Sequence, residues 1–188
     1  MLSLEHQRLD FISRSAGFRA FPLAGMTAWT AFGLASLLAP PATSIYLLLC
    51  ATGAIFPLAL GFAALTGQQV FQKGNAFASL IGQSVLMVNL IWVLHFALIS
   101  ERPALVPLSL AIGLGLHWIV FGWIIQSSLG LIHAIGRTGA CTVAYCFGGE
   151  LRMVAISAAV VVCYAFTLVR LQAWSRRAAL TGAPGGLG

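Results

Sequence analysis

The residue best suited to chemistry in this chain is Arg137, which lies near the middle of an apolar stretch over residues 128–147. On insertion scales an arginine at the centre of a transmembrane helix costs about 2.5–3.5 kcal/mol. The chain has four acidic residues, and each lies near an end of an apolar stretch: Glu5, Asp10, Glu101 and Glu150. We therefore expect no carboxylate beside Arg137, which leaves a water-filled or anion-binding cavity, neutral polar neighbours or a partner subunit to satisfy it.

A polar stripe surrounds this arginine. His133, Arg137, Cys141 and Tyr145 recur every four residues, so they share one face of a helix. His117 is expected at a depth similar to that of His133, and Asn89 at a mid-membrane depth within reach of Arg137. Our candidate ligand-binding residues are Arg137, His133, His117, Asn89 and Tyr145. A second arrangement stays open, in which Gly136-Arg137-Thr138-Gly139 forms a turn and splits the stretch into two half-length pieces.

Metal and catalytic chemistry are less well supported. Two facing histidines, His117 and His133, are a ligand type that haem and metal ions accept. However, His95 is expected near the opposite surface, so the paired tiers of a multi-haem cytochrome are missing. The four cysteines lack the short spacing of a zinc or redox motif. We find no nucleophile elbow, phosphate loop or HExxH helix, and we expect no cofactor, no metal and no catalytic residue.

The composition places these residues in a membrane. Of the 188 residues, 60% are hydrophobic and 7% are charged, whereas soluble domains carry about 25% charged residues. We predict an all-α membrane protein, a six-transmembrane-helix bundle preceded by a short amphipathic N-terminal helix, because each apolar stretch approaches the ~20 residues that a crossing needs. The predicted spans are 21–39, 44–65, 76–99, 104–125, 128–147 and 153–171. Pro57 should kink the second of them.

The chain divides into three parts. We expect residues 1–19 to be an amphipathic interfacial segment, residues 20–172 the six-span domain, and residues 173–188 a disordered cytoplasmic tail. Six spans place both termini on one side, together with seven basic residues, whereas Arg102 and Arg152 fall on the other side. The positive-inside rule therefore predicts a multi-pass protein of the cell membrane with both termini in the cytoplasm. The net charge of +6 is not clustered or interleaved with aromatic residues, so we expect no nucleic-acid partner.

Small residues suggest how the helices associate. Gly130, Ala134, Thr138 and Thr142 recur every four residues, a spacing that lets two helix backbones approach closely. Beyond the lipid bilayer, we consider a second copy of the chain and a different membrane subunit as partners. Two functions remain open, and an enzyme is the less favoured reading. One is the binding or passage of a small solute, anion or lipid headgroup at the buried polar site. The other is a structural or accessory subunit of a membrane complex without its own transport or catalytic activity.

Several short motifs in the apolar stretches extend this interpretation. They are Phe56-Pro57-Leu58 in the second stretch, Asn75 before the third, Asn89 within it, and residues 117–123 with Gly122. Over residues 20–170 the chain resembles a bacterial family of small six-span integral membrane proteins known only as a domain of unknown function. The resemblance implies the six-span architecture and a bacterial inner membrane. It implies no activity, ligand or catalytic residue.

Overall fold

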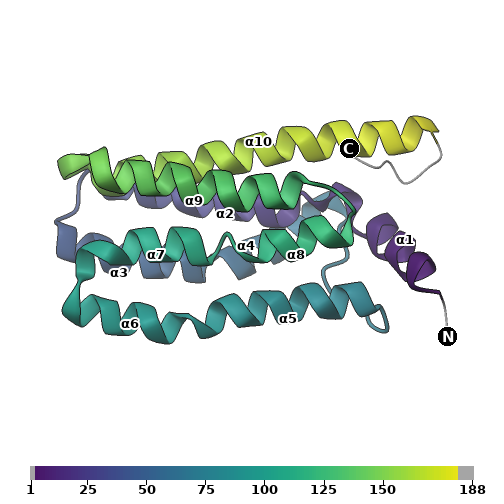
Figure 1. Ribbon diagram of the computed structural model, residues 1–188, viewed down its shortest axis with the longest axis horizontal. Coiled ribbons are helices and arrows are strands. Elements are labelled where there is room, and N and C mark those ends of the chain that lie inside the picture. Colours follow the sequence, from purple (N-terminus) through teal and green to yellow (C-terminus); the bar gives the residue numbers. More distant parts are fainter. Residues whose placement is uncertain (1–2, 182–188) are drawn as a thin grey trace.

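The computed structural model describes residues 3–181, and these residues form a bundle of long helices (Figure 1). Short 3-10 turns at Ala16–Phe18, Pro103–Leu105 and Gly149–Leu151 join some of the helices, and the described residues contain no strand. The α-helices are α1 Leu4–Arg14, α2 Ala20–Ala35, α3 Pro41–Gly53, α4 Ile55–Thr66, α5 Ala76–Leu90, α6 Trp92–Glu101, α7 Val106–Gly113, α8 His117–Ile124, α9 Leu129–Phe147 and α10 Arg152–Thr181. The all-α prediction is confirmed.

Four helical segments are long and apolar enough to cross a membrane. They are Pro41–Thr66, Ala76–Glu101, Pro103–Ile124 and Gly149–Arg176, each formed by consecutive helices or by a turn and a helix. The apolar α2 is shorter, with 16 residues. The 19-residue α9 is more polar, since it contains His133 and Arg137. The chain is therefore an all-α membrane-type protein, and its count of six spans stays a prediction.

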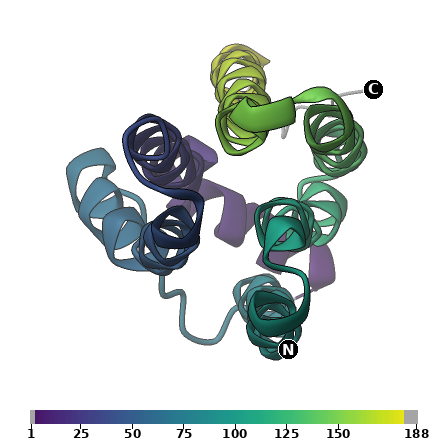
Figure 2. The same ribbon diagram turned by 90° about the vertical axis from the view of Figure 1, so that its left-hand side faces the viewer.

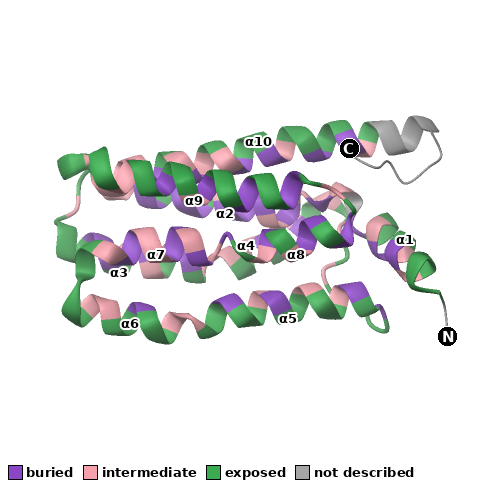
Figure 3. Ribbon diagram, viewed as in Figure 1, coloured by how far each residue is buried: buried purple, intermediate pink, exposed green. Residues whose placement is uncertain are grey.

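The centre of the bundle lies where α2, α9 and α10 meet. α10 packs against α9 and α2, while α9 also packs against α7 and α8, and α2 against α3 and α4. Viewed end-on, α9 and α10 lie next to each other, and α5 and α6 lie on the opposite side of the bundle (Figure 2). The buried residues accordingly follow the inner faces of α2 and α9, whereas α5 and α6 are largely exposed (Figure 3). Trp29, Leu110, Ile156 and Val160 are completely buried in this centre.

Three of the long segments are interrupted within their length. α3 and α4 meet at Ala54, α5 and α6 at Ile91, and α7 and α8 are separated by residues 114–116. The first break has a clear cause, because Pro57 has no N–H to donate to the carbonyl of Gly53, where α3 ends. This is the kink expected from the sequence. The turn at residues 114–116 lies beside Arg137.

The N-terminal helix α1 packs against the end of the bundle. Its Arg8 is buried, pairs with Glu5 at 2.6 Å and places its guanidinium carbon 5.1 Å from the centre of the Phe77 ring on α5. Asn75 ties α5 to this helix, since its Nδ2 donates to the carbonyl oxygen of Gln7 at 2.7 Å. α1 is thus fastened to the bundle by polar contacts, and its placement in the membrane interface stays a prediction.

The C-terminal helix corrects one expectation. We predicted a disordered tail from residue 173, but α10 continues to Thr181. Leu171 and Trp174 explain the longer helix, because both are buried and the Trp174 ring lies 6.1 Å from that of Phe18. Residues 182–188 of the predicted tail lie outside the described residues.

Candidate functional site

Arg137 lies on the buried face of α9. The helix runs unbroken from Leu129 to Phe147, so the alternative of a turn at residues 136–139 is wrong. The side chain of Arg137 is completely buried, with 0% of its surface exposed. Its Nε, Nη1 and Nη2 atoms have no hydrogen-bond partner among the described residues. The expectation that no carboxylate pairs with it also holds within the described part of the chain, where the ion pairs are Arg8–Glu5 and Arg14–Asp10.

Aromatic rings take the place that a carboxylate would fill. The guanidinium carbon lies 5.2 Å from the centre of the Tyr164 ring on α10 and 5.7 Å from that of Trp29 on α2. Such cation–π contacts are worth about 0.5–2 kcal/mol each, depending on desolvation. A ring face stabilises positive charge but accepts no strong hydrogen bond, so five N–H donors of the guanidinium remain available.

The break between α7 and α8 makes room for this side chain. A Cβ atom at Gly115 would lie 3.1 Å from the Cδ and 3.4 Å from the Nε of Arg137. Any larger residue at this position would press on the arginine side chain. Residues 114–116 form a tight turn in which the Gly115 N–H donates to the carbonyl oxygen of Ile112 at 2.8 Å, and this turn contacts the stem of the buried cation.

His133 lies one turn before Arg137 and is also buried, with 2% of its surface exposed. Its ring stacks on Trp118 with the ring centres 4.4 Å apart, and its Nδ1 lies 2.7 Å from the Oγ1 of Thr167. The Thr167 hydroxyl donates its one proton to the carbonyl oxygen of Cys163 at 2.8 Å. Thr167 must therefore accept from His133, which places a proton on Nδ1. The Nε2 atom is buried without a partner among the described residues.

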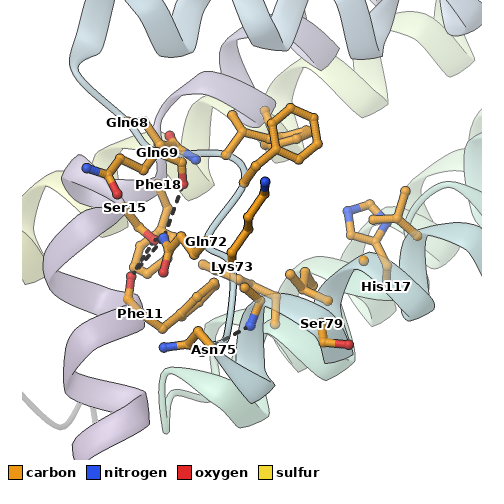
Figure 4. A pocket seen from close by; sticks show the side chains of 18 of the residues that line it. Phe11, Ser15, Phe18, Gln68, Gln69, Gln72, Lys73, Asn75, Ser79 and His117 are labelled. Carbon is orange, nitrogen blue, oxygen red and sulfur yellow. Dashed lines mark hydrogen bonds between the residues drawn. The ribbon is translucent and has the colours of Figure 1, made fainter.

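His117 links this group to a cavity. Its ring centre lies 5.9 Å from that of Trp118, and its Nδ1 is buried without a hydrogen-bond partner in the described structure. His117 is thus joined to His133 through Trp118, whose ring stacks on that of His133 at 4.4 Å. His117 also lines a cavity of about 570 Å³ between α1, α4, α5 and α8 (Figure 4). The structure thus brings together three of the five predicted site residues: Arg137, His133 and His117.

The other two predicted residues lie elsewhere. Asn89 is exposed on α5, where its Nδ2 donates to the carbonyl oxygen of Val85 at 2.8 Å, because Ser84 and Val88 occupy the inward face of that helix. Tyr145 lies two turns beyond Arg137 on α9, and its ring centre is 4.5 Å from the guanidinium carbon of Arg152. Neither side chain joins the group around Arg137. The structure separates them from Arg137 because the sequence gives depth along a helix more readily than the direction of each face.

Five residues of the site were not among our candidates: Trp29, Gly115, Trp118, Tyr164 and Thr167. Trp29 and Tyr164 come from α2 and α10, and nothing in their local sequence marks them as partners of an arginine on α9. Gly115 carried a weak signal, since Gly113 and Gly115 place two poor helix formers close together in an apolar stretch. In the described structure no three His, Cys, Asp or Glu residues gather as a metal site would require.

Comparisons of the chain with known proteins show the family to which it belongs. No curated protein and no solved structure matches the chain. The family model DUF7010, described as a family of unknown function, matches residues 4–173. This range includes α1 to α9 and most of α10, and therefore every residue of the group around Arg137. The chain thus belongs to DUF7010, a family of unknown function, in agreement with the resemblance seen in the sequence.

Proposed function

We propose that this protein is a six-span membrane protein that binds a small anion at Arg137 and passes it across the bilayer. The observation that carries the proposal is a completely buried guanidinium whose three nitrogens have no hydrogen-bond partner in the described structure. An isolated buried charge costs several kcal/mol, because it loses its hydration. The two ring faces offset part of that cost, and an anion would offset the rest through charge-assisted hydrogen bonds.

The donors around the site favour an anion over a cation or a neutral apolar ligand. Guanidinium presents its N–H groups in a planar fork that suits two oxygens of a carboxylate, nitrate or phosphate. The Nε1 of Trp29, whose ring faces Arg137, is a further buried donor without a partner among the described residues. The site therefore supplies positive charge and N–H donors, which are the groups that recognise anions.

The local turn beside Arg137 supports passage as well as binding. Its hydrogen bonds tighten to the i→i+3 pattern, as between Gly115 and Ile112, and such a stretch within a helix often marks a hinge. Irregular backbone at membrane depth is tolerated where it is buried in protein or lines a cavity. Transporters commonly use discontinuous helices at their substrate sites. Here residues 114–116 separate α7 from α8, and Gly115 packs against the side chain of Arg137.

A cavity lies near each end of the described bundle. One of about 570 Å³ lies near α1 and residues 68–75, and includes His117. The other, of about 780 Å³, lies near residues 36–46 and 149–154 and includes Glu150 and Arg152. Arg137 belongs to neither lining, and α9 carries it between the two ends of the bundle. A binding site that is closed off from both cavities corresponds to the occluded state of an alternating-access cycle.

The proposed topology follows from the helices and the charges. Counting α2, the four long segments and α9 gives six crossings, and α1 and the end of α10 lie at the same end of the bundle (Figure 1). The α1 end holds Arg14 as the last residue of α1 and Lys73 in the loop between α4 and α5, whereas Arg102 follows α6 and Arg152 begins α10 at the other end. By the positive-inside rule we place the α1 end in the cytoplasm of a bacterial inner membrane.

The accessory-subunit alternative has less support. It was motivated by the small-residue stripe on α9, but the closest approach in that stripe is used within the chain. A Cβ atom at Gly130 would meet the carbonyl oxygen of Trp118 and lie 2.7 Å from the Cα of Gly122, both on α8. Thr142, at the other end of the stripe, is exposed.

Native mass spectrometry tests the proposal directly. We would compare the gently solubilised wild type with Arg137→Met and Arg152→Met, each in the presence of nitrate, phosphate or acetate. Arg152 is the matched control, since it is also an arginine over an aromatic ring but lies at the end of the bundle. We expect one retained anion on the wild type and on Arg152→Met, and none on Arg137→Met. An unliganded chain in all three samples, or a co-purifying second protein, would favour the accessory subunit.

A further inference from the structure

The cavity beside His117 has the features of a second binding site, distinct from Arg137. Its volume of about 570 Å³ falls within the ~300–1,000 Å³ range of ligand sites. Its walls come from α1, α2, α5, α8, the segment before α5 and Phe56 of α4, and most of its lining is apolar. The aromatic residues of the lining are Phe11, Phe18, Phe21, Phe56, Phe71, Trp118 and Phe121.

One end of the cavity is polar and positively charged. Lys73, the one lysine of the chain, lines it and makes no ion pair in the described structure. The acidic groups of α1 are already engaged, since Glu5 pairs with Arg8 and Asp10 with Arg14. None of the described residues that line the cavity is acidic. The lysine ammonium is therefore free to meet an anionic group.

Gln72 adds a fixed acceptor beside this lysine. Its Nε2 donates to the Oγ of Ser15 at 3.2 Å and to the carbonyl oxygens of Phe11 and Gln69 at 3.4 and 3.1 Å, which fixes the orientation of the amide. The side chain of Gln72 is only 6% exposed, and its Oε1 is buried without a partner among the described residues. Figure 4 shows Gln72 and Lys73 on one side of the cavity and His117 on the other. The polar end thus offers a cation and an acceptor on a braced segment.

The opposite part of the cavity lies between two helices with different packing partners. α4 packs chiefly against α2 and α3, whereas α5 packs chiefly against α1, α6 and α8. Phe56 on α4 and Ile81, Gly82 and Val85 on α5 all line the space between them. Gly82 is exposed and a Cβ atom there would meet nothing within 4 Å, so this wall is open at its side. In a membrane such an opening faces lipid.

We propose that this cavity binds a single-chain amphiphile with an anionic headgroup, taken from the surrounding bilayer. The acyl chain would lie between α4 and α5 against the aromatic wall, and the anionic oxygens of the headgroup would contact Lys73. Where the headgroup carries a hydroxyl, as a glycerol phosphate does, this group would also donate to the Oε1 of Gln72. The cavity combines a largely apolar wall with one unpaired cation, Lys73, in the polar loop before α5. This combination suits an amphiphile better than a small soluble anion. A free fatty acid and a single-chain phospholipid share this chemistry.

The test uses the whole protein in nanodiscs with radiolabelled tetradecanoate and monotetradecanoyl glycerol phosphate, and with tetradecanol as the uncharged probe. Gly82→Trp fills the cavity, and Gly61→Trp is its control, because Gly61 is also helical, exposed and without neighbours within 4 Å of its Cβ position but does not line the cavity. Lys73→Gln removes the cation, Lys73→Arg restores it, and Arg170→Gln removes an exposed charge from the same end of the bundle.

We expect saturable binding of an anionic probe that Gly82→Trp abolishes and Gly61→Trp preserves. Lys73→Gln should weaken binding of the anionic probe about tenfold, as expected for the loss of one charge-assisted hydrogen bond. Lys73→Arg should restore the affinity, and Arg170→Gln should leave it unchanged. Stronger binding of tetradecanoate would identify a fatty acid, and stronger binding of the phosphate a phospholipid. Equal binding by both tryptophan variants would overturn the site, and equal affinity for tetradecanol would overturn the charged headgroup. Arg137→Met should leave this binding unchanged, so the two proposals fail separately.

Discussion

The guanidinium carbon of Arg137 lies 5.2 Å from the centre of the Tyr164 ring, so a completely buried cation rests on an aromatic face instead of a carboxylate. The two residues come from neighbouring helices, α9 and α10, whose packing forms much of the bundle centre. The interaction free energy between Arg137 and Tyr164 can be measured separately from the packing of either residue.

A double-mutant cycle with Tyr164→Leu and Arg137→Met isolates that energy. We expect a coupling of about 0.5–2 kcal/mol, because the ring face stabilises the charge only while both are present. The measurement is the free energy of unfolding of the four proteins in the same detergent. Tyr164→Phe is the control, since it keeps the ring and should retain the coupling. A coupling near zero would mean that the contact is incidental to packing.

A second prediction concerns the close approach of α8 and α9. Gly130→Ala should destabilise the protein by about 1–3 kcal/mol, because its Cβ would meet the carbonyl oxygen of Trp118 and the backbone of Gly122. Gly136→Ala is the matched control on the same helix, where a Cβ meets nothing within 4 Å. The control should be neutral or stabilising, because alanine favours a helix over glycine. Equal melting temperatures for the two variants would contradict the close approach.

A third prediction concerns the hydrogen bond that orients His133. Thr167→Val should cost about 1–3 kcal/mol, since it leaves a buried Nδ1–H without its acceptor. Thr142→Val is the control, because that hydroxyl is exposed and donates to its own helix at Thr138. Nitrogen NMR of labelled histidine should show a proton on Nδ1 of His133 in the wild type. An unprotonated Nδ1 would contradict the donor assignment.

Much of this architecture could be predicted from the sequence because hydropathy and turn residues act locally. Apolar stretches gave the positions of the long helices, and Pro57 gave the break between α3 and α4. The end of α10 could not be read in this way. The burial of Trp174 near Phe18 stabilises α10 beyond residue 173, and this contact between segments far apart in the sequence cannot be predicted from composition.

The site was predicted in part for a similar reason. Arg137 and His133 share a face of α9 by their spacing, which depends only on helix geometry. The rings of Trp29 and Tyr164 come from α2 and α10, so their place beside Arg137 depends on how helices pack. Asn89 was misplaced because the rotation of α5 is fixed by packing of Ser84 and Val88, which a single sequence does not specify.

The most direct test of anion binding at Arg137 is thermal unfolding of the purified protein at increasing nitrate concentration. Chloride, which lacks the two oxygens that fit the guanidinium fork, keeps the ionic strength constant. A ligand that binds only the folded state raises its stability with concentration. Wild type and Arg152→Met should therefore melt at rising temperatures, and Arg137→Met should not respond. A flat response in the wild type, together with a higher melting temperature for Arg137→Met in every salt, would contradict the proposal and make Arg137 a structural residue satisfied by its aromatic neighbours.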